Sequence, residues 1–289
     1  MGKENAAPRT KGFGLLWRRL RRNAFALVGI AVFTFFVLMA AVGPWVAPYG
    51  HQDQNISERL RPPGPGHLFG TDQYGRDIFS RILVGSRGIF LLGGTGTLLA
   101  ALIGTTIGLF SGYYGGLIDE IIMRLLDILL SFPPLLLALV LLATVGSSLV
   151  NLVAVVTILY VPMLARVVRS MVLDLKTKEF VEAAKTRGEG QFYILFREIL
   201  PNALAPLFVE MSMRFSYAIF LVASLGFLGL GVQPPSPDWG LQINEARAYF
   251  STAPWMLLFP AAAISLLVVA TNLMSDGLRQ ILHPSTGKR

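Results

Sequence analysis

The side chains that could do chemistry are few and lie far apart in this sequence. Of the three histidines, His51 and His67 share one polar segment and His283 lies near the end, so none has the spacing of a metal-ligand set. The chain has no cysteine, and so no thiol nucleophile. Walker A, G-x-S-x-G and H-E-x-x-H motifs are absent as well. We therefore expect no catalytic residue, no metal site and no cofactor bound by this chain.

One cluster of charged residues has helical spacing: Asp119, Glu120, Arg124 and Asp127. On a helix, Arg124 can reach Glu120 four residues before it and Asp127 three residues after it, on one face. This pattern predicts local ion pairs at the inner end of a membrane helix rather than a reactive centre.

A second pair, Glu210 and Arg214, lies four residues apart beside an apolar run. Ionisable residues inside a membrane helix often mark a pathway. We favour a local ion pair near the inner membrane boundary over a pathway site. Asp72 is expected to cap a short helix that runs along the outer surface, and a connector is favoured there over a catalytic role for Asp72, Arg76 or Asp77.

The apolar runs that must hold these residues define the class of protein. Hydrophobic residues make up 53% of the chain and charged residues 15%, against about 25% charged in soluble domains. A membrane-spanning helix needs about 20 apolar residues. The sequence predicts an all-α polytopic membrane protein with six spans, at about 23–47, 89–112, 121–143, 150–172, 205–231 and 255–275. The first is read as a retained anchor, because its 25-residue apolar run is too long for a signal peptide.

Lys and Arg are distributed asymmetrically between the segments that join the spans. Seven lie in residues 1–22, seven in 166–197 and three after 276, but only six lie in the 48–88 and 232–254 loops together. This bias predicts that both termini and the 173–204 loop are cytoplasmic. It also accounts for the net charge of +8 without a nucleic-acid partner.

The spans and loops divide the chain into successive segments. We expect a basic cytoplasmic tail, a first span, an external loop with a short interfacial helix, a five-helix core that contains a cytoplasmic loop, and a cytoplasmic tail. Their ranges are 1–22, 23–47, 48–88, 89–276 with the loop at 179–202, and 277–289.

Glycines and prolines inside the spans suggest where helices pack and bend. Gly104, Gly108, Gly112 and Gly116 are each four residues apart, a spacing that lines one helix face and allows another backbone to approach. Pro133 and Pro134 should break or kink the third span, either as a hinge or as a static bend.

The stretch "EFVEAAKTRGEGQFYILFREILPN", residues 179–202, is polar although it lies between two apolar runs. It predicts a short helix with Phe180, Ala183, Ala184 and Arg187 on one side, ended by glycines at 188 and 190. A second short helix follows, separated by Pro201 from the fifth span. Two small residues beside an aromatic one, with Glu182 nearby, are typical of a docking element. An amphipathic connector lying on lipid headgroups is the alternative.

The spacing Glu182-Ala183-Ala184, Gly188 and Ile199-Leu200-Pro201 resembles the EAA loop of ABC importer membrane subunits. Glu198 departs from the family pattern, which has isoleucine there. The segments 67–87, 123–139, 224–240 and 272–284 are similar to the second, C-type permease of the dipeptide/oligopeptide/nickel family, and His283 replaces a usual acidic residue.

This resemblance implies a type I ABC importer permease fold in a bacterial inner membrane. It implies a heterodimer with a homologous permease, two ATP-binding subunits that carry ATP and Mg, and an extracytoplasmic solute-binding protein. In that family the loop forms coupling helices that lie in a groove of the ATPase.

The ligand is left open among dipeptides, longer peptides, glutathione, cell-wall peptides and chelated nickel. An ion-coupled carrier or channel is a different-class alternative, which the near absence of charge in mid-span positions disfavours. A membrane enzyme lacks any catalytic set here.

Overall fold

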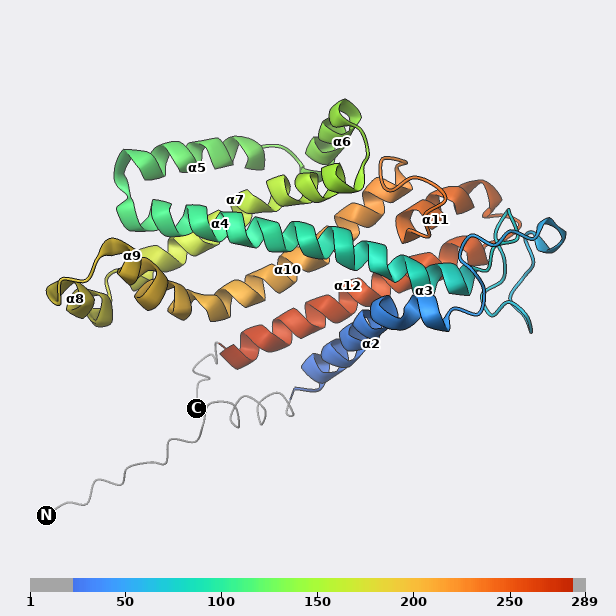
Figure 1. The fold of residues 1–289 in the computed structure, drawn as a ribbon, viewed down its shortest axis with the longest axis horizontal. Coiled ribbons are helices and arrows are strands. Elements are labelled where there is room, and N and C mark those ends of the chain that lie inside the picture. Colours follow the sequence, from blue (N-terminus) through green and yellow to red (C-terminus); the bar gives the residue numbers. More distant parts are fainter. Residues whose placement is uncertain (1–22, 283–289) are drawn as a thin grey trace, which may run out of the picture.

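The structure is a computed structural model that describes residues 23–282. The predicted tail at 1–22, the part of the predicted 277–289 tail from 283 onward and the position of His283 therefore lie outside the described residues. The described chain is a bundle of long helices with two isolated β-bridges (Figure 1). Its α-helices are α2 (Ala24–Val46), α3 (Ile78–Ile89), α4 (Thr95–Tyr114), α5 (Gly116–Leu130), α6 (Pro134–Val145), α7 (Leu149–Leu175), α8 (Glu179–Thr186), α9 (Gln191–Tyr193), α10 (Leu200–Phe227), α11 (Trp239–Ala246) and α12 (Trp255–Leu282). The π-helical turns are η2 (Phe90–Gly94) and η3 (Ile194–Ile199), and the 3-10 turns are η1 (Ile56–Glu58) and η4 (Arg247–Tyr249).

Five of the helical segments are long and apolar enough to cross a membrane, and the bent pair α5–α6 makes a sixth if it counts as one span. Their length follows from uninterrupted apolar sequence, since about 20 residues at 1.5 Å each cover the hydrocarbon core. The predicted all-α architecture with six spans agrees with this count.

The second span is longer than expected, because α3, η2 and α4 form one helix of 37 residues from Ile78 to Tyr114. The predicted separate helix along the outer surface is therefore wrong. The π turn at Phe90–Gly94 absorbs an extra residue without ending the helix. Asp77, and not Asp72, is the N-cap, and its side chain accepts a 2.7 Å bond from the backbone N–H of Ser80.

The fifth span also begins earlier than predicted. Residues Gln191–Phe227 form one 37-residue helix, so Pro201 does not separate a short second helix from the span. Proline lacks the N–H that would bond back one turn, and the π turn η3 just before it accommodates the changed hydrogen-bond register.

Two apolar clusters hold the bundle together. The larger one is centred on α4 and α7 and extends to the buried side of α8 and η3, and the smaller one joins α2, α3, α11 and α12. Helix α2 lies against α12, where a Cβ on Gly29 would be 2.6 Å from the backbone nitrogen of Met274.

The α8 loop and the 47–77 loop lie at opposite ends of the bundle (Figure 1). Helices α8 and α9 lie at the left of Figure 1, whereas the 47–77 loop and α11 lie at the right. This separation agrees with the sorting of the loops by charge in the sequence.

Candidate functional site

Helix α8 is held on the bundle by its apolar side. Val181 and Ala184 are fully buried and belong to the same cluster as Ile194, Leu195 and Ile199 of η3. Acidic residues in its first turn and a lysine in its last turn suit the helix dipole. The helix is therefore packed against the start of the 191–227 helix.

A glycine turn ends α8 as its residue type predicts. Gly188 has a φ of +80°, its N–H donates to the carbonyl of Lys185 (2.9 Å), and the N–H of Glu189 donates to the carbonyl of Ala184 (3.1 Å). This pair of bonds is the Schellman motif, which favours glycine at the left-handed position. Gly190 does not share that role: its φ is −69°, and it is the N-cap of α9.

Fewer residues of α8 face away from the bundle than the sequence predicted. Glu182 and Ala183 are exposed and Phe180 is half-buried, but Ala184 faces the interior. The prediction that both alanines face a partner is therefore wrong, because a hundred-degree step per residue places Ala184 over η3. Of the later motif residues, Ile199 is buried, Leu200 is half-buried and Pro201 is exposed.

Arg187 is committed to contacts inside the loop. Its guanidinium lies 3.4 Å from Glu198 Oε1 and 3.6 Å from Glu189 Oε1, which ties the end of α8 to η3. Glu198 is thus the partner of Arg187 at the position where the resembling family has isoleucine. A charge at this position is satisfied by the arginine across the glycine turn, which the sequence pattern alone did not indicate.

The helices next to α8 are joined by ionic contacts at the same end of the bundle. Arg169 of α7 binds both carboxylate oxygens of Asp119 of α5, and Ser111 of α4 donates to the same carboxylate. Lys176 Nζ, at the end of α7, donates to the carbonyl of Gly112 (2.8 Å). Helices α4, α5 and α7 are therefore joined to one another at the end of the bundle that carries α8.

The predicted partners of Arg124 need a correction. Arg124 bonds Glu120 (2.7 Å), but Asp127 binds Arg166 of α7 instead. The prediction considered one helix only, and α7 supplies a competing arginine from across the interface.

Three of the four spaced glycines lie against α7. A Cβ on Gly104, Gly108 or Gly112 would be 2.9, 2.5 or 2.9 Å from the nearest α7 atom. Only glycine, which has no side chain, therefore allows α4 and α7 to pack this closely at these positions. Gly116 does not continue this face: it begins α5 with a φ of +63°, and a Cβ there would meet nothing within 4 Å. The chain turns at Gly115 and Gly116, which breaks the register of the row.

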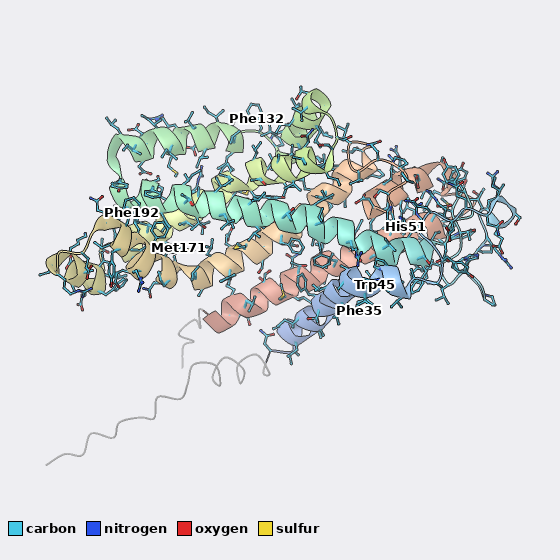
Figure 2. The ribbon with its side chains drawn as sticks, viewed as in Figure 1. Phe35, Trp45, His51, Phe132, Met171 and Phe192 are labelled. Atoms are coloured by element: carbon cyan, nitrogen blue, oxygen red, sulfur yellow. The ribbon has the colours of Figure 1, made fainter. Side chains whose placement is uncertain are left out.

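The third span is interrupted where the two prolines stand. Helix α5 ends at Leu130, α6 begins at Pro134, and their axes differ by 87°. Pro134 occupies the first helical position, which needs no N–H. Phe132 lies at this junction (Figure 2) and is 52% exposed.

The Glu210–Arg214 pair forms as the sequence predicts, and Arg214 also contacts a residue of α7. Arg214 Nε donates to Glu210 Oε1 (2.7 Å), and Nη1 lies 3.0 Å from Sδ of Met163, near the middle of α7. The pair was expected near the inner boundary. The contact with Met163 places the pair beside the middle of α7.

At the opposite end, a buried ionic network was missed by sequence reasoning. Arg76 binds Asp72 (2.5 Å) and Glu245 (2.8 Å), and Arg81, only 1% exposed, lies 3.3 Å from Glu245. The alternating charges in "TDQYGRDIFSR" were the available signal, but their partner is in α11. This network fastens the 67–87 segment to α11 and supports a structural role for Asp72 and Arg76.

His67 is held in the same region by two carboxylates. Its Nδ1 lies 2.8 Å from Asp77 and its Nε2 lies 3.3 Å from Glu58, and the hydrogen bond from His67 lowers the pKa of Glu58. Within residues 23–282 no group of three or more His, Cys, Asp or Glu side chains could hold a metal ion.

Asp238 caps α11 from a fully buried position. Its side chain accepts a 3.0 Å bond from the N–H of Leu241, and its second carboxylate oxygen has no hydrogen-bond partner among the described residues. Burial raises the pKa of Asp238 to about 6.

Comparison with known proteins gives two family matches. The family described as "Binding-protein-dependent transport system inner membrane component" matches residues 104–288, and "N-terminal TM domain of oligopeptide transport permease C" matches residues 13–63. The first match includes Gly104, Gly108 and Gly112 of α4 and the whole 179–202 loop.

Among curated proteins, the chain is 43% identical over 268 residues to the dipeptide transport system permease protein DppC of Alkalihalophilus pseudofirmus (93% of this chain, 88% of that protein). It is 40% identical over 274 residues to DppC of Haemophilus influenzae (93% of each chain). It is 43% identical over 272 residues to the glutathione transport system permease protein GsiD of Pectobacterium atrosepticum (93% and 89%).

Proposed function

The chain belongs to the binding-protein-dependent transport system inner membrane components, as a C-type permease of the dipeptide/oligopeptide group, and we propose that α8 is its docking element for a separate ATPase. It is a multi-pass membrane subunit of an ABC importer for peptide-like solutes. The proposal concerns how movement of an ATP-driven partner reaches the membrane helices.

The observation that carries the proposal is the two-sided character of α8. One side is buried on η3 through Val181 and Ala184, and the other exposes Glu182 and Ala183. A partner that covers the exposed side can move α8 only together with η3. Small and acidic residues there allow close approach and pairing with a basic group.

Helix continuity supports transmission over a long distance. Because η3 and α10 belong to one 37-residue helix, a displacement of α8 is passed directly to the span. The same displacement would reach α7 through the short connection at 176–178, and the contacts of Asp119 with Arg169 and of Lys176 with Gly112 join α7 to α5 and α4. The break at Pro133 and Pro134 would serve as a hinge in this motion, and spectroscopic distances across it in two nucleotide states would test that role.

Family membership suggests the rest of the assembly, and the names of the relatives suggest the class of solute. A heterodimer with a homologous permease would form the pathway, two ATPase subunits would bind ATP and Mg, and an extracytoplasmic binding protein would deliver a dipeptide, longer peptide or glutathione-like ligand. The α8 end and both termini would be cytoplasmic, and the 47–77 loop would face the binding protein. Family membership favours this arrangement over an ion-coupled carrier.

The decisive experiment reconstitutes the complete transporter in vesicles with Glu182→Lys in this chain. We expect loss of ATP-driven uptake and of its coupling to ATP hydrolysis, while the chain stays in the membrane and binds the second permease. Gly188→Asp is expected to act in the same way by altering the turn that ends α8.

Glu120→Lys is the matched control, since Glu120 is a half-exposed acidic residue of α5 outside the docking face. This variant reverses the same charge and should transport normally. Normal uptake by Glu182→Lys, or cross-linking that shows α8 against lipid only, would refute the docking role.

A further inference from the structure

A hollow beside the interrupted third span has the features of a ligand subsite. Its volume is about 350 Å³, within the range of small-molecule sites. It lies between α6, α7 and α10, and its wall is mostly apolar, with Arg214 as the charged lining residue. The other lining residues are Pro134, Leu135, Tyr160, Met163, Tyr217, Phe220, Leu221 and Ser224.

A second hollow continues from the first along α10. It measures about 440 Å³ and shares Leu135, Phe220 and Ser224 with it. Phe220 is 63% exposed and Tyr217 is 54% exposed, so this helix face is not covered by the chain itself. The two hollows follow α10 from mid-span toward the end that carries α11.

The guanidinium of Arg214 has N–H donors that are not taken up by its partners in the chain. Nε and Nη2 both donate to one oxygen of Glu210, Oε1, whereas a fork-to-fork pair would use both oxygens. Nη1 faces the thioether of Met163, which is a weak acceptor. Guanidinium donors therefore remain for a planar anionic group that enters the hollow.

The charged side chains of Arg214 and Glu210 are largely buried, which costs free energy and suggests a functional reason for the pair. The side chains of Arg214 and Glu210 are only 19% and 16% exposed. Ionisable residues inside spans are rare and usually face a cavity or pathway. Glu210 keeps the empty site neutral, and it competes with an arriving anion, so the ligand is held weakly enough to leave again.

We propose that Arg214 binds a carboxylate of the transported solute as it passes along α10, with Glu210 as its partner when the hollow is empty. The proposal rests on the proposed import function and names a site inside the pathway. The guanidinium fork fits a free carboxylate, which a peptide carries at its C-terminus. Rings such as Tyr217 and Phe220 offer apolar contact to side chains of varied size.

The test uses the complete transporter in vesicles, with dialanine as the probe. We expect Arg214→Gln to lower dialanine uptake roughly tenfold at saturating loaded binding protein, because a charged hydrogen bond is lost. ATP hydrolysis stimulated by the loaded binding protein should persist, and Arg214→Lys should recover part of the uptake. Arg124→Gln, which breaks an exposed pair of the same i,i+4 type, should behave like the unaltered protein.

Uptake by Arg214→Gln at the unaltered rate would overturn the proposal. If that variant fails to assemble, a single cysteine at Ser224 in this cysteine-free chain replaces it as the readout. Its labelling by a small hydrophilic thiol reagent should be slowed by dialanine during turnover, and labelling unaffected by dialanine would also overturn the site. Absence of uptake of dialanine, a longer peptide and glutathione alike by the unaltered complex would instead overturn the proposed function.

Discussion

Adding one methyl group at Gly108 should separate α4 from α7. In Gly108→Ala the new Cβ would lie 2.5 Å from the carbonyl oxygen of Ala165 and 2.8 Å from Cβ of Val168. Ordinary van der Waals contacts begin near 3.4 Å, and one of the opposing atoms is backbone, so no rotamer change can relieve the clash. Overpacking of this kind costs up to about 3 kcal/mol.

The substitution also has a favourable part, because alanine is a better helix former than glycine by about 1 kcal/mol. The expected net effect is a loss of about 2 kcal/mol in the free energy of unfolding. Gly94→Ala is the matched control in the same 37-residue helix, since its Cβ would meet only Phe215 at 3.8 Å. This control should be neutral or more stable by up to about 1 kcal/mol.

The assay is equilibrium unfolding of the purified chain in mixed micelles, followed by loss of helical circular dichroism. Gly108→Ala and Gly94→Ala should differ by about 3 kcal/mol, which is the cost of the clash, because the helix-propensity gain is the same in both variants. Equal stabilities would refute close α4–α7 packing as the reason for the glycine spacing.

Burial raises the pKa of Asp238 from 3.8 to about 6, so the folded state binds this proton more tightly than the unfolded state. The free energy of unfolding should therefore fall by on the order of 3 kcal/mol as pH rises from about 4 to about 6. Asp238→Asn, which keeps a capping side chain, should remove that dependence from melting curves, and an unchanged pH profile would contradict the assignment. Arg187→Glu should reduce uptake per ATP by repelling Glu198, and the double variant Arg187→Glu/Glu198→Arg should restore it; no recovery would mean that the pair does not couple α8 to η3. Ala184→Leu should destabilise the isolated chain by about 1–3 kcal/mol, whereas Ala183→Leu should leave its melting unchanged and weaken capture of the ATPase subunit, so equal melting shifts would disprove the two-sided assignment of α8.

Local patterns were sufficient for the class of the protein and for several details of the loop. Charge-free runs of more than 20 residues have no stable alternative to membrane helices, which is why the spans could be placed from composition. Gly188 was recognised as a helix terminator because a left-handed residue favours glycine whatever surrounds it. Pro133 and Pro134 marked the interruption for an equally local reason, the missing N–H.

Where a helix ends could not be derived from single residues in every case. Pro201 was taken as a boundary, but a π turn before it lets the helix continue. Whether such a turn forms depends on how well Ile194, Leu195 and Ile199 pack beneath α8, and that packing involves residues from other elements.

The amino-acid sequence by itself determined which residues can be in the membrane, where glycine can stop a helix and which spacing permits close packing, because these properties depend on neighbours within one helix turn. Only the tertiary structure decided that Ala184 faces inward, that Glu198 pairs with Arg187 and that Arg214 faces a hollow. The physical reason is that burial and ion pairing depend on the neighbouring helices. The sequence of one helix does not specify which of its faces another helix will cover.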